Sequence, residues 1–346
     1  MSLRVEIEKR LGNFALQAEF ETREQTLALL GASGCGKSVT LKCIAGIMTP
    51  DKGRIELDGQ VLFDAEKGIN LPPQKRRVGY LFQQYALFPN MTVVQNICCG
   101  IRARGAERER LVREQMRRFQ LEGLEKSYPA QLSSGQQQRV ALARILAGEP
   151  KAILLDEPFS ALDSYLKWSL EAELTQMLAN FTGPLVWVSH DLGECWRNCR
   201  TVCVLEQGRT GPVTDLETLV HRPATVEQAR LAGCRNIYPV RQTPGGLRVP
   251  GWEASLPLPD SAEAGSMLGI PAEAVRMGCG GTPWTVCRAV RDLEWTEVLL
   301  QPEGATADAP VLCARLDLDQ AVQVGETVTV SFDPARLLVL KERTGR

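Results

Sequence analysis

Residues 26–48, TLALLGASGCGKSVTLKCIAGIM, carry the strongest structural signal in the chain. The apolar run 26–30 predicts a strand that is buried on both faces of a sheet. The next residues, 31–38, fit the pattern GxxxxGK(S/T), and residues 39–48 predict a helix directly after them. Glycines let the backbone curl so that successive N–H groups, together with the helix N-terminus, can bind phosphate oxygens. The stretch therefore predicts a strand–loop–helix unit that binds phosphate groups.

Two side chains of this loop are expected to act directly on a nucleotide. Lys37 can place its ammonium at the β- and γ-phosphates, and Ser38 can offer its hydroxyl to Mg²⁺. The other loop residues expected to bind ATP are Gly31, Ser33, Gly34, Cys35, Gly36 and Val39. A glycine-rich turn with a chance Lys-Ser pair is the alternative, and the strand and helix around the motif argue against it.

An acidic pair follows a second apolar run. Residues 153–155 predict another buried strand, and Asp156 and Glu157 come directly after it. In P-loop enzymes a carboxylate at the end of such a strand reaches the metal, so Asp156 is expected to hold Mg²⁺ through water. Glu157 can polarise the attacking water as a general base. Alone, the pair fits a surface turn equally well; the phosphate loop favours the catalytic interpretation.

Residues 132–139, LSSGQQQR, open a predicted helix and resemble the LSGGQ signature of ABC ATPases, with Ser134 in place of the first glycine. Other P-loop classes such as kinases, GTPases and helicases lack this signature. Gln83, the run 160–163 and His190 resemble the Q-loop, D-loop and switch histidine of the same family, in the same order. On these motifs the chain is identified as a member of the ABC ATPase family.

The resemblance implies a role for each matching residue. Gln83 would sense Mg²⁺ and the γ-phosphate, and His190 would join Gln83 and Glu157 as a catalytic residue. In the family two cassettes pack head to tail, and the signature of one closes over the ATP of the other. The residues implied at that interface are Ser133, Ser134, Gly135, Gln136 and Asp163. Phe14 is the candidate for stacking on adenine, and a strand residue facing the core is an equal alternative.

The pattern along the chain predicts two domains. Strands alternate with helices over residues 1–232, which indicates an α/β domain: a mixed sheet core with a helical subdomain at about 85–150. After residue 232, short alternating runs separated by Pro- and Gly-containing turns predict a small all-β, barrel-like domain over 233–346. This second part resembles the OB/TOBE-like regulatory domain of importer ATPases. The expected fold is therefore an ABC-type P-loop NTPase followed by a β domain.

Composition limits the partners. A net charge of −1 argues against nucleic acid as the main ligand. No apolar run approaches the length of about 18 residues that a transmembrane helix needs, and residues 1–10 lack the apolar core of a signal peptide. We therefore expect a protein of the cytosol, and the resemblance implies that it works as a peripheral subunit on the cytoplasmic face of the membrane. The resemblance implies a homodimer or a pair with a paralogue, integral membrane permease subunits and, indirectly, a solute-binding protein.

The transported solute is indicated only by resemblance. Residues 71–83 and the trailing β domain look most like importer ATPases for molybdate and sulfate, so an oxyanion is expected. An importer ATPase for sugar, polyamine or iron, or a soluble non-transport ABC ATPase, is the alternative. Residues 233–236, GCRN, keep only Arg and Asn of an oxyanion-cradling Ser-Ala-Arg-Asn segment. The apolar run 85–89 is expected either to receive a permease helix or to pack inside the helical subdomain.

Overall fold

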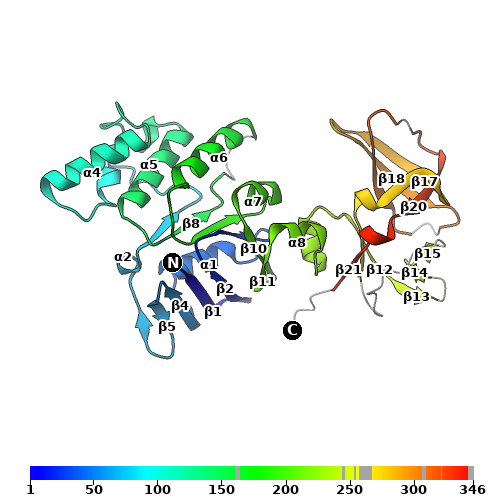
Figure 1. Cartoon of the computed structure of the whole chain (residues 1–346), viewed down its shortest axis with the longest axis horizontal. Helices are drawn as coiled ribbons and strands as arrows, with labels where there is room; N and C mark the ends of the chain where they lie inside the picture. The colour runs from blue at the N-terminus through cyan, green and yellow to red at the C-terminus, as the bar shows by residue number, and fades with distance from the viewer. Residues whose placement is uncertain are drawn as a thin grey trace. The chain divides into compact units, whose positions relative to one another are not determined.

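The computed structural model describes residues 1–159, 164–243, 246–252, 255–256, 267–305, 309–320 and 322–341. The chain forms two compact units, Met1–Leu216 and Glu217–Arg346 (Figure 1). The domain boundary expected at residue 232 falls just after helix α9 (Val226–Leu231) of the second unit. Among the described residues, no helix combines the length and the apolar character that crossing a bilayer requires.

The first unit is built on one mixed sheet of eleven strands, in the order β6-β5-β4-β1-β2-β11-β10-β3-β9-β8-β7. The strands β10, β3, β9, β8 and β7 run parallel to one another. Their bounds are Thr201–Glu206, Thr26–Leu30, Leu185–Ser189, Ala152–Asp156 and Val78–Leu81. The strands β8 and β9 are buried along their whole length, because the centre of a parallel sheet is covered on both faces. The predicted runs 26–30 and 153–155 are thus strands of the parallel part of the sheet.

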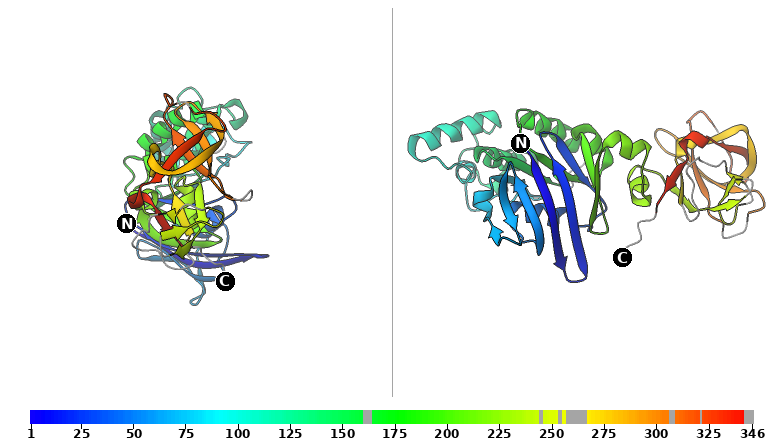
Figure 2. Two further views of the ribbon diagram at one scale, coloured as in Figure 1. Left: turned by 90° about the vertical axis from the view of Figure 1, so that its right-hand side faces the viewer. Right: turned by 60° about the horizontal axis from the view of Figure 1, so that its bottom comes forward.

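The remaining strands of the sheet pair in antiparallel fashion at its other end, with β11 also adding parallel to β2. They are β1 (Leu3–Leu11), β2 (Phe14–Thr22), β4 (Lys52–Leu57), β5 (Gln60–Asp64), β6 (Ile69–Asn70) and β11 (Arg209–Asp215). Buried and exposed residues alternate along β1 and β2, since only one face of these strands packs on the core. Figure 2 shows β1 and β2 side by side as long blue arrows.

Helix α1 (Lys37–Ala45) joins the two parts of the sheet in one core. Leu41, Cys43 and Ile44 pack in a single apolar cluster with residues of both the antiparallel strands and the central parallel strands. The phosphate loop is therefore anchored on a helix that is enclosed by the fold. The other helices are α2 (Pro73–Arg76), α3 (Val93–Cys98), α4 (Gly105–Arg118), α5 (Ser134–Ala147), α6 (Ser164–Leu178) and α7 (Leu192–Asn198).

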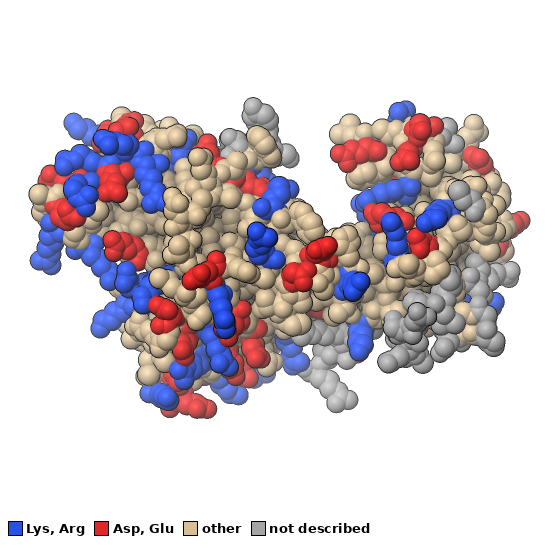
Figure 3. All heavy atoms as spheres, in the orientation of Figure 1, with Lys and Arg blue, Asp and Glu red and all other residues tan. Residues whose placement is uncertain are grey.

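The first unit also contains a helical subdomain. Helices α3, α4 and α5 pack on one another, and they extend beyond the sheet as the cyan-to-green helices of Figure 1. The surface of α4 carries both charges: Arg110 pairs with Glu107 and Glu114 along the helix. Figure 3 shows basic and acidic side chains interspersed over the visible face of this unit. The expected α/β cassette with a mixed sheet and a helical subdomain is confirmed.

In its described residues, the second unit consists of antiparallel sheets, the short helices α8 (Leu216–His221) and α9, and two turns of 3₁₀ helix. Its four-stranded sheet has the order β19-β18-β17-β20, with bounds Leu312–Leu316, Thr296–Pro302, Val275–Arg291 and Thr327–Phe332. A three-stranded sheet combines β12 (Asn236–Pro239), β16 (Met267–Ile270) and β21 (Leu338–Leu340). Another combines β13 (Arg241–Thr243), β14 (Gly246–Arg248) and β15 (Ser255–Leu256). The expected C-terminal β domain is confirmed as a curled antiparallel one.

The long strand β17 explains the curl of this unit. Its register against β20 shifts between Met277 and Thr282, and its register against β18 shifts between Val286 and Arg288. Such irregularities bend a strand and increase its twist. The bend wraps the sheet around a core that contains Trp252 and Trp284, whose rings meet edge to face at 4.9 Å.

Candidate functional site

The phosphate loop connects β3 to α1. At two positions, Gly31 and Gly36, the loop has no room for a side chain or has a backbone conformation that favours glycine. Gly36 precedes the helix with φ 112°, a left-handed conformation that glycine adopts without strain. A Cβ on Gly31 would lie 2.3 Å from the carbonyl oxygen of Leu205. Ser33 and Gly34 are exposed at the tip of the loop, whereas Cys35 is buried and Val39 packs against the core. The loop is thus held at its ends and open at its tip.

Lys37 is buried inside the loop. Its ammonium donates hydrogen bonds to the carbonyl oxygens of Gly31 at 2.8 Å and Ala32 at 2.9 Å. It also lies 3.7 Å from a carboxylate oxygen of Glu157. A buried ammonium needs such partners, because burial without them is costly. The charge of Lys37 is therefore fixed between the phosphate loop and the residue that follows β8.

Ser38 and Asp156 meet directly, although 118 positions separate them in the sequence. The Ser38 hydroxyl donates to Asp156 Oδ1 at 2.8 Å, and the Tyr80 hydroxyl donates to Asp156 Oδ2 at 2.7 Å. Burial and then the bond to Asp156 raise the pKa of the Tyr80 phenol far above its ordinary value. Hydroxyl and carboxylate oxygens are the ligands that Mg²⁺ prefers, so this pair fits the expected metal.

Tyr80 was not among the residues predicted for the site. It belongs to β7, whose sequence Val78–Leu81 reads as an ordinary buried strand. A usable signal existed, because a buried tyrosine usually needs a partner for its hydroxyl. The identity of that partner depends on the pairing of β7 with β8, which the sequence alone does not show.

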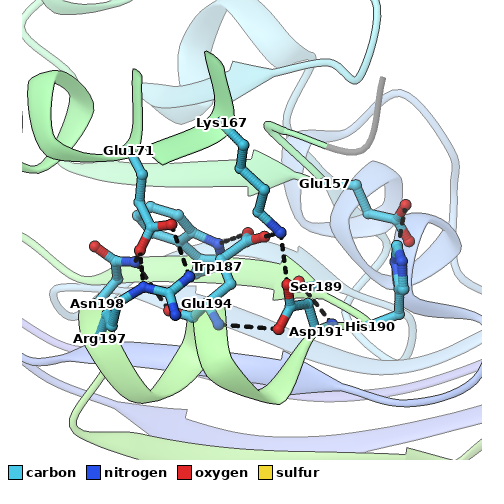
Figure 4. A network of polar contacts seen from close by, with 10 residues as sticks. All are labelled: Glu157, Lys167, Glu171, Trp187, Ser189, His190, Asp191, Glu194, Arg197 and Asn198. Carbon is cyan, nitrogen blue, oxygen red and sulfur yellow. Dashed lines mark hydrogen bonds and ion pairs between the residues drawn. The ribbon is translucent and has the colours of Figure 1, made fainter. Parts of the chain in front are cut away.

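Glu157 directly follows β8 with φ 46°, an uncommon backbone conformation for a residue with a side chain. Its N–H donates to the carbonyl oxygen of Val188 in β9, which holds the backbone in this conformation. The Glu157 carboxylate lies 3.5 Å from His190 Nδ1, and His190 follows β9 (Figure 4). Strained backbone persists where the surrounding structure fixes it, and it is frequent at functional sites. The structure thus brings Lys37, Glu157 and His190 together.

Gln83 and Phe14 were also predicted for the site. Gln83 is exposed two residues after β7 ends. The Phe14 ring is half-buried against the core and also touches the phosphate loop, since a Cβ on Gly36 would lie 2.9 Å from Phe14 Cζ. Adenine stacking by Phe14 remains a prediction.

The signature residues open α5. Ser133 precedes the helix, and its hydroxyl accepts a hydrogen bond from the Gln136 N–H while the Gln136 side chain accepts one from the Ser133 N–H. This capping box leaves Ser133 exposed and Ser134 half-buried at the positive end of the helix. Gly135 is buried against Leu170 of α6. A Cβ at this position would lie only 3.0 Å from Leu170 Cδ2. Asp163 lies outside the described residues.

The two halves of the site come from strands that are separated by a single strand. The phosphate loop follows β3, the acidic pair belongs to the end of β8, and β9 with His190 runs between them. Parallel strands present their carboxyl ends at one edge of the sheet, so all three meet there. Together with the capped signature helix, this geometry defines a nucleotide-binding cassette of the ABC type.

Comparisons with known proteins agree. A family model described as ABC transporter matches residues 17–160. The molybdate/tungstate import ATP-binding protein WtpC of Archaeoglobus fulgidus is 43% identical over 210 residues, which cover 60% of this chain and 85% of that protein. The Fe(3+) ions import ATP-binding protein FbpC of Escherichia coli K12 is 32% identical over 325 residues, or 92% of this chain and 90% of that protein.

A solved dimeric ATP-binding cassette in a post-hydrolysis state, bound to ADP and Pi, has 29% sequence identity and a TM-score of 0.52. The match covers 62% of this chain and 99% of that structure. The chain therefore belongs to the ABC transporter family, as an ATP-hydrolysing subunit of the importer type.

Proposed function

We propose that this chain energises the import of a small oxyanion, such as molybdate or sulfate, by hydrolysing ATP as a dimer beneath a membrane permease. The observation that carries the hydrolytic part is the meeting of Lys37, Asp156, Glu157 and His190 at one edge of the sheet. The proposal that the solute is an oxyanion is based on the sequence of residues 71–83 and on the similarity to WtpC. Iron and polyamines are the alternatives, because FbpC and a spermidine/putrescine import protein, PotA, are similar as well.

Each residue of the site has a proposed task. Lys37 and the loop N–H groups bind the phosphates, and Ser38, Asp156 and Gln83 hold Mg²⁺, directly or through water. Mg²⁺ supplies charge neutralisation at the phosphates when it is bound. Glu157 takes a proton from the attacking water, and His190 stands beside its carboxylate, 3.5 Å away.

The signature is proposed to act on a second copy. Ser134 and Gly135 lie at the N-terminus of α5, where free N–H groups and the helix dipole favour an anion. They would bind the γ-phosphate of ATP held by the other chain, and Ser133, Gln136 and Asp163 would complete that contact. ATP then shifts the pair toward a closed dimer, because these contacts exist only when it is closed. The dimeric state of the solved cassette supports this assignment.

The segment 85–89 is proposed as the permease contact. Arg144 donates to the carbonyl oxygens of Tyr85 at 3.1 Å and Ala86 at 2.9 Å, and its guanidinium lies 5.4 Å from the Phe88 ring centroid. Asn96 accepts from the Phe88 N–H and donates to its carbonyl. The backbone is thus fixed while the Phe88 side chain stays 46% exposed. A rigid loop that presents an exposed aromatic ring favours partner binding over internal packing.

Replacing Phe88 with Asp is expected to abolish solute uptake while ATP hydrolysis by the isolated chain stays within about twofold of the native rate, because the ring lies outside the hydrolytic site. Uptake into proteoliposomes and phosphate release measure the two effects. Tyr128→Asp is the control, since Tyr128 is another exposed aromatic residue, at 45% exposure, before the signature. Full uptake by the Phe88 variant would contradict the proposal that this loop contacts the permease.

We place the boundary of the C-terminal domain at residue 232. Residues 233–346 are proposed to form a regulatory, TOBE-like domain. Asn236 is not free to bind an oxyanion: its side chain donates to the carbonyls of Ile270 and Cys313 and accepts from the Cys313 N–H and the Tyr238 hydroxyl. Arg235 pairs with Glu297. These partners support a structural task for residues 233–236.

The assembly is proposed to lie at the cytoplasmic face of the membrane, held there by permease subunits that receive solute from a binding protein. A nucleic-acid ligand is not proposed, given the net charge of −1. Uptake by the complex reconstituted with its permease tests the solute: molybdate, sulfate, Fe³⁺ and spermidine are offered in turn. Uptake of molybdate or sulfate alone supports the oxyanion, and uptake of Fe³⁺ or spermidine alone contradicts it.

A further inference from the structure

His190 lies on a very short connection whose two ends are both held. Ser189 ends β9, and Asp191 precedes α7 as its capping residue. The Asp191 N–H donates to Ser189 Oγ at 3.0 Å, and Asp191 Oδ1 accepts from the Glu194 N–H at 3.1 Å. The direction of the His190 side chain therefore depends on how Asp191 and the start of α7 are placed.

A single ammonium ties this connection to another helix. Lys167, in the first turn of α6, donates to Asp191 Oδ2 at 2.6 Å and lies 2.9 Å from Glu194 Oε2. The other oxygen of Glu194 accepts from Trp187 Nε1 at 2.7 Å, and Trp187 belongs to β9. Figure 4 shows these bonds converging between α6, β9 and α7. Lys167 thus reaches both flanks of His190.

The charges make this contact hard to replace. Glu194 is buried, and a buried carboxylate needs a compensating charge. Burial lowers the pKa of the Lys167 ammonium, but its hydrogen bonds to Asp191 and Glu194 outweigh burial, so the pKa lies above its ordinary value. Without the ammonium, the carboxylates of the capping residue Asp191 and of Glu194 in the first turn of α7 would repel each other, and Glu194 would be left uncompensated. The start of α7 would then move, and His190 with it.

We propose that Lys167 is a positioning residue for ATP hydrolysis, which holds His190 beside Glu157 through Asp191 and Glu194. This inference rests on the proposed function, in which His190 and Glu157 act on the nucleotide. Lys167 itself contacts neither His190 nor Glu157 in the described contacts; it acts through the connection between β9 and α7. Small displacements of a positioned group can lower a rate by about 100-fold.

The same pair of helices supplies a matched control. Arg197 of α7 donates to both carboxylate oxygens of Glu171 in α6, at 2.7 and 2.9 Å, and Glu171 is buried. Figure 4 places this ion pair at the opposite end of the network from His190. Loss of Arg197 therefore removes an ion pair between α6 and α7 while leaving the connection at His190 intact.

Lys167→Met in the full chain is expected to lower kcat for ATP hydrolysis about tenfold and to leave the KM for MgATP within about twofold. Lys167→Arg, which keeps the charge, is expected to retain most of the activity, and Arg197→Met to retain kcat. In a His190→Ala background, Lys167→Met should lower kcat no further, because both changes remove the same contribution. Equal losses in Lys167→Met and Arg197→Met, or additive losses with His190→Ala, would overturn the proposal.

A spectroscopic measurement separates this inference from the hydrolytic role. The chain has only two histidines, so ring signals in a ¹H–¹⁵N NMR spectrum can be assigned with a His221→Gln variant. Lys167→Met, or Lys167→Gln if the methionine variant does not fold, should shift the His190 signal, and Arg197→Met should not. An unmoved His190 signal overturns the positioning role. Absence of ATP hydrolysis by the native chain would instead contradict the proposed function.

Discussion

Glu157→Gln is expected to lower kcat for ATP hydrolysis by about a thousandfold while MgATP binding changes little. The amide keeps the size of the side chain but cannot take a proton from the attacking water. The carboxylate lies between Lys37 and His190, with its oxygens 3.7 Å from the ammonium and 3.5 Å from Nδ1, whereas the neighbouring Asp156 carboxylate is bonded to Ser38 and Tyr80. Phosphate release by the purified chain at saturating MgATP measures the effect.

Glu149→Gln is the matched control for this change. Glu149 is an exposed glutamate that also has a positive φ, 48°, so the substitution repeats the same chemistry on similar backbone. It is expected to leave kcat unchanged. A Glu157→Gln variant that hydrolyses ATP at the native rate would show that another group acts as the base.

Lys37→Met is expected to weaken ATP binding by about 100-fold, because charge-assisted hydrogen bonds to phosphate contribute about 2–3 kcal/mol. The methionine keeps most of the volume in the buried loop but removes the ammonium that now bonds to Gly31 and Ala32. Titration calorimetry with MgATP measures the dissociation constant, and urea unfolding checks that the variant is folded.

Lys42→Met is the control for the lysine, since Lys42 lies on the same helix α1, near its other end. Its dissociation constant for MgATP should match that of the native chain. Unaltered binding by Lys37→Met would mean that the loop N–H groups hold the phosphates without the ammonium, and Lys37 would lose its proposed role in affinity.

The grouping of Lys37, Glu157 and His190 was predictable because its signals are local. The loop that contains Lys37 is continuous in sequence, and Glu157 directly follows an apolar run of the length of a buried strand. Each motif directly follows its own predicted strand. The rule that parallel strands end at the same edge of a sheet was then enough to predict that the motifs lie close together. The resemblance to a known family then placed His190.

The contacts that support the site were not predictable. Tyr80 bonds Asp156 only because β7 pairs with β8, and Lys167 reaches Asp191 only because α6 packs near α7. Arg76 illustrates the same limit in the fold: it is fully buried, and it donates to the carbonyls of Cys43 and Ile44 at the end of α1. A lysine or arginine in sequence is usually assigned to the surface, and its buried partners appear only in the folded chain.

The molar mass and nucleotide content of the Glu157→Gln variant in MgATP test the central claim most directly. We expect light scattering after size exclusion to show a dimer that retains ATP, with the phosphate of each nucleotide bound by Lys37 of one copy and by Gly135 of the other. A monomer without bound nucleotide under these conditions would contradict the proposed shared site.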